Sequence, residues 1–268
     1  MDRTGELVFL KLGGSLITDK ARPYTPRPRV IRALAKEIHK VLQAMPNLRL
    51  LIGHGSGSFG HQAAASYATR RGVQSSLEWR GFAEVAAAAA RLNRLVADAL
   101  LEENVPILCL QPSASALCHD GILTHLETHP IQEALRRGLI PLTYGDVALD
   151  DVRGGTIVST EELFVYLAKT LRPDRILLTG SAPGVVDGKG DVISSVTPAT
   201  FPTIRPLLRE AQVTDVTGGM ADKVALMVEL VTGQKELVVH ILSGLEPELV
   251  RRALEDSALS IGTRITSQ

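Results

Sequence analysis

Short apolar runs alternate with longer helical patterns along this chain of 268 residues, and this alternation limits the folds that it can adopt. A short apolar run is typical of a strand buried on both faces, which requires a layer of helices on each side of the sheet. Strands are predicted over residues 7–12, 48–52, 106–110, 139–143, 175–179, 236–242 and 261–265, the last at a sheet edge. Helices are predicted over residues 28–45, 77–103, 130–137, 161–171, 219–232 and 247–254. This order indicates an α/β fold with a mostly parallel sheet.

Two intervening segments carry turn-forming residues instead of a periodic pattern. Residues 144–155 are predicted to be a polar, turn-rich connection, and residues 198–217, rich in Pro and Thr, a mobile loop or a partial lobe boundary. The length permits one large α/β domain or two modest ones. Because we find no repeat, low-complexity tract or clear linker, we predict a single domain over residues 1–268.

The overall charge and composition exclude several classes of partner. Lys plus Arg (29) balances Asp plus Glu (29), so no global field draws the chain to nucleic acid or to an anionic membrane. The apolar runs are too short to span a bilayer, and the polar N-terminus does not resemble a signal peptide. Cys109 and Cys118 lack C-x-x-C spacing and indicate reduced thiols, so we predict a cytoplasmic protein.

Three glycine loops follow predicted strands, at the sheet edge where parallel α/β folds bind ligands. The first is Gly13-Gly14-Ser15, with Lys11 at the end of its strand. Paired glycines let backbone N–H groups approach phosphate oxygens closely, and the lysine can reach the same anion. A tight turn beside a surface lysine explains this short motif equally well.

The second loop, Gly55-Ser56-Gly57-Ser58-Phe59-Gly60-His61, fits two phosphate-binding patterns incompletely. It has the glycines of G-x-G-x-x-G, but it follows the second strand, and no strand ending in an acid lies about 20 residues further on. It also fits the P-loop frame, except that His61 replaces the lysine. What remains is an anion-binding loop that ends in histidine near a helix start. Without the glycines, the better interpretation of His61 is a side chain that faces water. His54 is a weaker candidate for anion binding, because it can simply form a hydrogen bond to the backbone.

The third loop, which ends in Gly218-Gly219, opens a predicted helix with Lys223 one turn in. This arrangement places a cation beside a helix N-terminus and is typical of a second phosphate clamp, although ordinary capping with a solvated lysine is the alternative. Lys20 can reach back over the first loop, but its spacing alone favours a solvated side chain. Asp146 either orients a ligand or stabilises a turn.

The residues around these loops indicate phosphoryl transfer without a covalent enzyme intermediate. Thr160 is predicted to be an N-cap, and the carboxylate of Glu161 can hold two lysines apart and aligned. No serine has the neighbours of a nucleophilic triad, and no histidine set has metal-ligand spacing, so we predict no metal ligands in the chain. Lysines, backbone N–H groups and Mg²⁺ can together neutralise a transferred phosphoryl group.

Several of these motifs resemble the amino acid kinase superfamily, in order over nearly the whole chain. They are Lys11-Leu12-Gly13-Gly14-Ser15, Thr179-Gly180, and Asp215-Val216-Thr217-Gly218-Gly219-Met220 with Lys223. Within that superfamily, four further segments are similar to the isopentenyl phosphate kinases. These are the loop 54–61, Gln111-Pro112-Ser113-Ala114, Tyr144-Gly145-Asp146-Val147 and Gly262-Thr263-Arg264-Ile265.

The resemblance implies a three-layer αβα sandwich with a mostly parallel sheet of about eight strands, and a homodimer. An N-terminal lobe, residues 1–172, would bind the acceptor and form the dimer, and residues 173–268 would bind the nucleotide. The implied reaction moves the γ-phosphoryl group of ATP, with Mg²⁺, to isopentenyl phosphate and yields isopentenyl diphosphate.

The resemblance also implies roles for individual residues. The implied catalytic residues are Lys11, Lys20, His61, Glu161 and Lys223, with His61 holding the acceptor phosphate. The implied acceptor-binding residues are Ser56, Gly60, His61, Asp146, Thr160, Phe82 and Ala86. The implied ATP-binding residues are Lys11, Gly13, Gly14, Ser15, Gly57, Thr179, Gly180, Gly219 and Lys223. Phe82 and Ala86 lie one turn apart on a predicted helix face and would line a slot for the hydrocarbon tail, although core positions show the same spacing.

Two departures from the family pattern affect these expectations. Many members carry aspartate where this chain has Glu161, and many carry two acids in the loop that here runs Thr179-Gly180-Ser181-Ala182-Pro183. A phosphonate kinase that acts on fosfomycin is the nearest alternative, because that class also resembles the histidine-ending loop. A non-catalytic nucleotide-binding or storage subunit is the other, but binding alone does not require three lysines around one group.

Overall fold

The computed structural model describes residues 5–60, 67–210 and 219–268. Its main sheet has eight strands in the order β10-β12-β11-β9-β1-β2-β6-β3. Their bounds are β1 Leu7–Leu12, β2 Arg49–His54, β3 Ile107–Cys109, β6 Ile140–Tyr144, β9 Arg175–Gly180, β10 Ser195–Val196, β11 Val238–Ser243 and β12 Thr263–Ile265. Only β12 runs antiparallel to a neighbour, β11, among these described strands. The predicted sheet is therefore confirmed.

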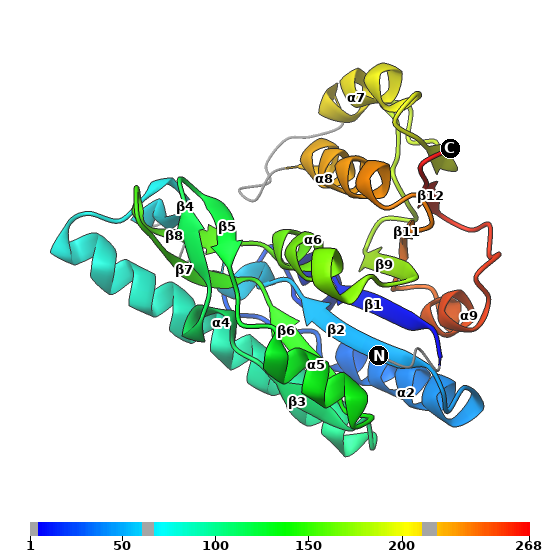
Figure 1. Cartoon of the computed structure of the whole chain (residues 1–268), viewed down its shortest axis with the longest axis horizontal. Coiled ribbons are helices and arrows are strands. Elements are labelled where there is room, and N and C mark those ends of the chain that lie inside the picture. Colours follow the sequence, from blue (N-terminus) through cyan, green and yellow to red (C-terminus); the bar gives the residue numbers. More distant parts are fainter. Residues whose placement is uncertain (1–4, 61–66, 211–218) are drawn as a thin grey trace.

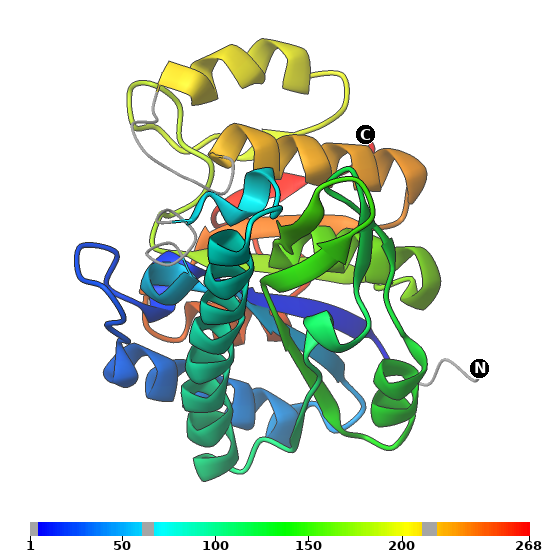
Figure 2. The ribbon, with the colours of Figure 1, turned by 90° about the vertical axis from the view of Figure 1, so that its left-hand side faces the viewer.

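Helices cover both faces of this sheet, as Figures 1 and 2 show. One face is covered by α2 Pro28–Ala44, α4 Ser76–Glu102 and α9 Leu249–Glu255, and the other by α5 His129–Arg136, α6 Thr160–Leu171, α7 Phe201–Glu210 and α8 Met220–Gly233. The central strand β1 divides its side chains between the two cores. Leu7 and Phe9 pack on the α6 and α8 side, whereas Val8, Leu10 and Leu12 pack on the α2 and α4 side. Alternation of side chains along a fully buried strand therefore produces the three layers.

A second, four-stranded sheet, which the sequence did not predict, lies beside the main one. Its strands, in the order β5-β4-β7-β8, are β4 Leu117–His119, β5 Ile122–His125, β7 Asp146–Asp150 and β8 Gly154–Val158. The prediction for residues 144–155 was therefore wrong. Asp150 stabilises the β7–β8 turn because its carboxylate accepts hydrogen bonds from the N–H groups of Val152 and Arg153. The apolar run of β7, Val147-Ala148-Leu149, has only three residues between two aspartates, so the sequence resembled a turn-rich segment.

Two further predictions differ from the structure. β12 is not an edge strand, because it pairs with both β10 and β11. The segment predicted as a loop over 198–217 contains the ten-residue helix α7, which carries Pro206 in its interior. Proline normally disfavours a helix interior, which explains why the sequence indicated a loop. No helix of the described chain is both long and apolar enough to cross a membrane.

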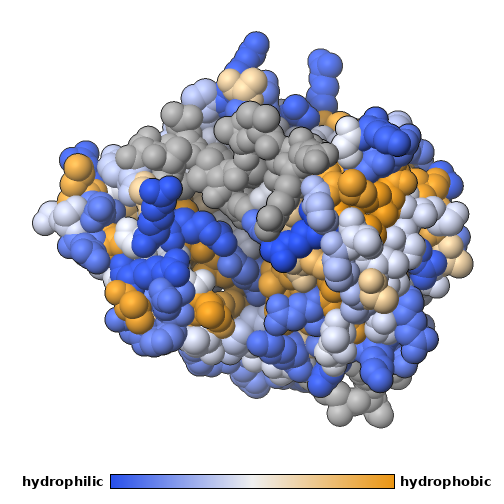
Figure 3. Space-filling model, turned by 90° about the horizontal axis from the view of Figure 1, so that it is seen from above, coloured by the Kyte–Doolittle hydropathy of each residue, from blue (hydrophilic) through white to orange (hydrophobic). Residues whose placement is uncertain are grey.

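Seen from above, the molecule presents a largely hydrophilic surface (Figure 3). The face is hollowed near its centre, and its largest hydrophobic patch lies to one side. Three short elements complete the described part of the fold: α1 Gly14–Ile17, η1 Thr69–Arg71 and η2 Pro112–Ala114.

Candidate active site

The loops that follow β1, β2 and β9 meet with their backbones in contact. The N–H of Gly13 donates to the carbonyl of Thr179 at 2.8 Å. A Cβ at Gly13 would lie 2.5 Å from that carbonyl oxygen, and a Cβ at Gly14 would lie 2.5 Å from the amide nitrogen of Gly57. Any side chain at these positions would push the loops apart. The glycines are therefore required for close approach, whether or not a phosphate is bound.

A cleft of about 420 Å³ opens between these loops and the N-termini of α6 and α8. Twelve of the residues singled out in the sequence line it: Lys11, Gly13, Gly14, Ser15, Lys20, Ser56, Gly57, Thr160, Glu161, Thr179, Gly180 and Lys223. They come from five separate segments of the chain. A cleft at the carboxyl ends of parallel strands, lined by cations and glycine backbone, is chemically suited to a polyphosphate.

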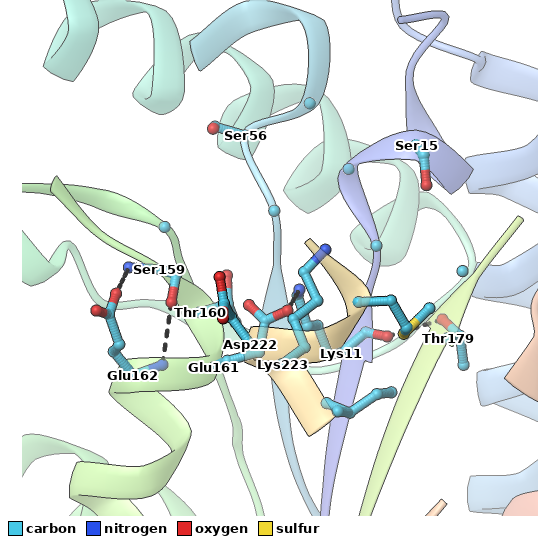
Figure 4. A pocket seen from close by; sticks show the side chains of 18 of the residues that line it. Lys11, Ser15, Ser56, Ser159, Thr160, Glu161, Glu162, Thr179, Asp222 and Lys223 are labelled. Carbon is cyan, nitrogen blue, oxygen red and sulfur yellow. Dashed lines mark hydrogen bonds and ion pairs between the residues drawn. The ribbon is translucent and has the colours of Figure 1, made fainter. Parts of the chain in front are cut away.

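Glu161 forms the electrostatic centre of the cleft, with Lys11 and Lys223 beside it (Figure 4). Its carboxylate forms an ion pair with Lys11, and both side chains are almost entirely buried. Burial by itself would raise the pKa of Glu161, but the positive charges of Lys11 and Lys223 outweigh that effect and hold the pKa below its usual value. Glu161 is therefore ionised at neutral pH, and the cluster keeps a net positive charge that can face a phosphoryl group.

The start of α6 is fixed by hydrogen bonds on both sides of Glu161. Ser159, not Thr160, is the N-cap: its hydroxyl accepts from the N–H of Glu162, and the Glu162 carboxylate accepts from the N–H of Ser159. The Thr160 hydroxyl instead donates to the carbonyl of His54 at 2.7 Å. This bond attaches the first turn of α6 to the end of β2, just before the second glycine loop.

Comparison with known proteins agrees with this geometry. The model of the amino acid kinase family matches residues 6–243. The chain belongs to the amino acid kinase family. An isopentenyl phosphate kinase of Methanothermobacter thermautotrophicus is 33% identical, over 98% of this chain and 100% of that protein. One of Haloferax volcanii is 40% identical over 84% of this chain and 88% of its own length. A crystal structure of an isopentenyl phosphate kinase, 29% identical, covers 97% of this chain and 100% of its own with a TM-score of 0.80.

Six residues singled out in the sequence do not line the cleft of this amino acid kinase, or cannot be placed. His61 lies outside the described residues. Gly60 packs on Ser56, and Gly219 caps α8. Asp146 is buried, and its carboxylate accepts from the N–H groups of Ser113 and Val147.

Phe82 and Ala86 belong to a small apolar cluster between α4 and the second sheet. Val85 and Val147 form its buried centre, and Ile157 packs against them with Phe82 and Ala86. Ile157 also lines the cleft, so the cluster adjoins the cleft that the glycine loops and lysines line.

Arg70 also lines the cleft, and no sequence motif predicted it. It lies on the short helix η1, and its guanidinium donates to the Glu162 carboxylate at 3.1 Å. The arginine is outside every glycine motif and every periodic pattern. It reaches the cleft because η1 packs against β8. It adds a fourth cation to the lysine set of this kinase.

The side chain of His54 packs at the start of the second glycine loop and stabilises it. Its fully buried ring stacks on Tyr144, with ring centroids 5.4 Å apart, and contacts the carbonyl of Gly55 and the Asn93 amide, each at 3.1 Å. Burial lowers the pKa of His54 to about 4, so the ring is neutral at pH 7. The sequence interpretation of His54 as a backbone-bonding residue agrees with these contacts.

Acidification is expected to destabilise the chain partly through His54. The unfolded state binds a proton with a pKa near 6.5 and the folded state only near 4. The stability present above pH 6.5 is therefore lost as the pH falls toward 4, by about 2–3 kcal/mol for this group. Urea unfolding should show a smaller acid loss for His54→Gln than for wild type, with the exposed His119→Gln as control. Equal losses in all three proteins would contradict the assignment.

Proposed function

We propose that this kinase transfers the γ-phosphoryl group of ATP to isopentenyl phosphate, forming isopentenyl diphosphate and ADP. Relatives that carry the isopentenyl phosphate kinase name align with nearly the full length of the chain. The observation that carries the proposal is the cluster of Lys11, Lys223 and Glu161 at the meeting point of the glycine loops. Positioned cations are what in-line phosphoryl transfer requires of an enzyme.

The proposed mechanism needs no covalent enzyme intermediate. Gly14 and Ser15 offer backbone N–H groups to ATP phosphates, and Gly13, whose own N–H is bonded to Thr179, lets the two loops approach closely. Lys11, Lys20 and Lys223 neutralise the transferred group. An oxygen of the acceptor phosphate attacks the γ-phosphorus as the bond to the β–γ bridging oxygen breaks, and ADP leaves. Residues 173–268 contribute the nucleotide side of this cleft, and residues 1–172 the acceptor side.

Mg²⁺ fits this site best as a companion of ATP. The described residues include no group of three His, Cys, Asp or Glu side chains that could hold a metal ion. The cleft does supply lysines and a glycine backbone that a Cβ would obstruct, which suits the phosphates themselves. When bound with ATP, Mg²⁺ would add to the neutralisation of phosphate charge.

The acceptor's hydrocarbon tail is proposed to lie against the apolar cluster of Phe82, Val85, Ala86, Val147 and Ile157. Ile157 connects this cluster to the cleft, so a phosphate in the cleft can carry a short apolar tail along the same wall. A small polar epoxide such as fosfomycin has no hydrocarbon tail to pack against the partly buried Phe82, Ala86 and Ile157. The cluster therefore favours an isoprenoid acceptor over a phosphonate antibiotic.

A larger side chain at Ala86 should weaken acceptor binding selectively. Ala86→Leu adds volume to the cluster, and overpacking of this kind is expected to raise the KM for isopentenyl phosphate roughly ten-fold while the KM for ATP stays unchanged. Its exposed neighbour supplies the matched control, Ala87→Leu. If both variants have the wild-type KM, Ala86 does not line the tail site.

His61 remains a proposal from sequence, because the structure does not describe it. We expect His61→Ala to lower kcat/KM for the acceptor by on the order of 10²-fold or more, as when a transition-state hydrogen-bond donor is lost. In steady-state kinetics, kcat/KM for the acceptor should fall, whereas the KM for ATP should stay at the wild-type value. Wild-type kinetics would remove His61 from the site.

A homodimer in the cytoplasm is also proposed. Four exposed apolar residues lie in the N-terminal lobe, residues 1–172: Leu108 on the sheet-edge strand β3, and Leu117, Ile122 and Leu149 on the second sheet. Burying them against a second copy would remove apolar area from water. Sedimentation equilibrium tests this assembly directly.

An acceptor panel tests the proposed function. ADP release is measured by a coupled assay with isopentenyl phosphate, dimethylallyl phosphate and fosfomycin, each with ATP and Mg²⁺. We expect the two isoprenoid phosphates to be turned over and fosfomycin not. Turnover of fosfomycin alone would replace the proposal with the phosphonate kinase alternative, and ATP binding without turnover of any acceptor would favour a nucleotide-binding subunit.

A further inference from the structure

Residues 18–26, which we call the Lys20 loop, are fastened to the second glycine loop by a set of hydrogen bonds. A β-bridge between Thr18 and Pro26 closes the Lys20 loop at its base. Across the gap, the N–H of Ser58 donates to the Thr18 hydroxyl at 2.9 Å, and the N–H of Thr25 donates to the Ser58 hydroxyl at 3.1 Å. Ser58 is therefore bonded to both ends of the loop that carries Lys20.

One aromatic side chain, next to the base of the Lys20 loop, attaches the loop to other segments. The ring of Tyr24 meets the buried ring of Phe59 edge-on, with the ring centroids 5.7 Å apart. The guanidinium of Arg91, on α4, lies 5.5 Å from the centroid of the Tyr24 ring. Edge-to-face and cation–π contacts of this kind are both attractive. Tyr24 therefore joins three segments: the Lys20 loop, the second glycine loop and α4.

The backbone of Tyr24 indicates that these contacts are specific. Its φ is +50°, a left-handed conformation that is uncommon for a bulky residue and persists only where the surroundings impose it. Burial of the side chain does not explain this conformation, because Tyr24 is 44% exposed. The N–H of Tyr24 donates to the carbonyl of Ser58, so backbone and ring are held by adjacent residues, Ser58 and Phe59.

We propose that Tyr24 is a positioning residue for Lys20. By attaching the Lys20 loop to the second glycine loop and to α4, it fixes Lys20 at the wall of the cleft that also contains Ser56 and Gly57. Lys20, which would contact the transferred phosphoryl group, then keeps a fixed position relative to the second glycine loop, which would hold the acceptor. The inference rests on the proposed function in one respect, since it assigns Lys20 to the transferred group.

Kinetics of four variants test the coupling between the two residues. Tyr24→Ala should lower kcat by about 10- to 100-fold, as a misplaced catalytic group does. Tyr24→Phe should retain most activity, because the described residues make no hydrogen bond to the Tyr24 hydroxyl and the ring contacts remain. In a Lys20→Ala background, Tyr24→Ala should change kcat by less than about two-fold. An equal loss in both backgrounds, or a Tyr24→Ala enzyme with wild-type kcat, would overturn the proposal.

Limited proteolysis gives a readout that does not depend on the substrate. Trypsin cleaves after Lys20, whereas Pro23 protects the bond after Arg22. Tyr24→Ala should increase the rate of cleavage after Lys20 roughly ten-fold, with an unchanged Tm, because local opening of the loop becomes easier. Tyr24→Phe should match wild type. Equal cleavage rates would reject the positioning role even if isopentenyl phosphate is turned over, whereas a changed rate with no isoprenoid turnover would leave it standing and reject only the proposed function.

Discussion

Lys223→Met is expected to lower kcat by about 10²- to 10³-fold, while the protein still folds. Lys223 is one of two lysines whose charge acts on Glu161, and it lines the cleft in the first turn of α8. Methionine keeps most of the volume but removes the cation from the transferred group. The Lys11–Glu161 ion pair survives in this variant, so the fold keeps its buried charges compensated.

The measurement is single-turnover transfer from ATP, which separates the chemical step from product release. Lys235→Met is the matched control, because Lys235 is exposed and is not among the residues that line the cleft. Lys223→Arg should recover part of the rate, since it restores charge with a different geometry. A Lys223→Met enzyme with a wild-type chemical step would remove this lysine from the transition state.

Glu161→Gln is expected to damage both activity and stability. The substitution leaves the buried ammonium of Lys11 without its counter-charge, and breaking a buried ion pair in this way costs about 3–5 kcal/mol. Transfer should also slow, because Lys11 and Lys223 lose the carboxylate that attracts both of them. Urea unfolding measures the free energy of unfolding, and coupled ADP release measures the rate.

Glu161→Asp separates the charge of this residue from its length. Aspartate keeps the carboxylate but withdraws it by one methylene from Lys11, so we expect a smaller loss of stability than for glutamine. Glu229→Gln, on the exposed face of α8, is the control for charge removal alone. If Glu161→Gln unfolds at the same urea concentration as that control, Glu161 does not compensate Lys11 in the folded state.

The elements that sequence reasoning predicted well are those whose burial alone determines them. Every residue of β1 is buried, so its run of mostly apolar residues directly predicted a central strand. The glycine loops were found because backbone contact between Gly14 and Gly57 excludes any side chain there. Lys11 and Lys223 were found because each adjoins one of those loops.

The elements that were missed depend on contacts between distant segments. The β7–β8 hairpin carries its apolar residues partly on an exposed face, and Asp150 holds its turn through local bonds that no periodicity reveals. Arg70 reaches the cleft only because η1 packs on β8. Ser159 could have been distinguished from Thr160 as the N-cap, since Glu162 lies three residues after Ser159 and completes a capping box.

The main-chain contact between Gly14 and Gly57 has a consequence for how enzymes of this shape can diversify. Because no side chain separates these two loops, the distance between the donor and acceptor phosphates that we propose they hold is set by peptide geometry and not by residue choice. Selection for new acceptors cannot easily lengthen or shorten that span. It can act freely on the proposed tail site, where Phe82, Ala86 and Ile157 are ordinary exchangeable side chains. A constant transfer distance and a variable tail site can therefore evolve independently.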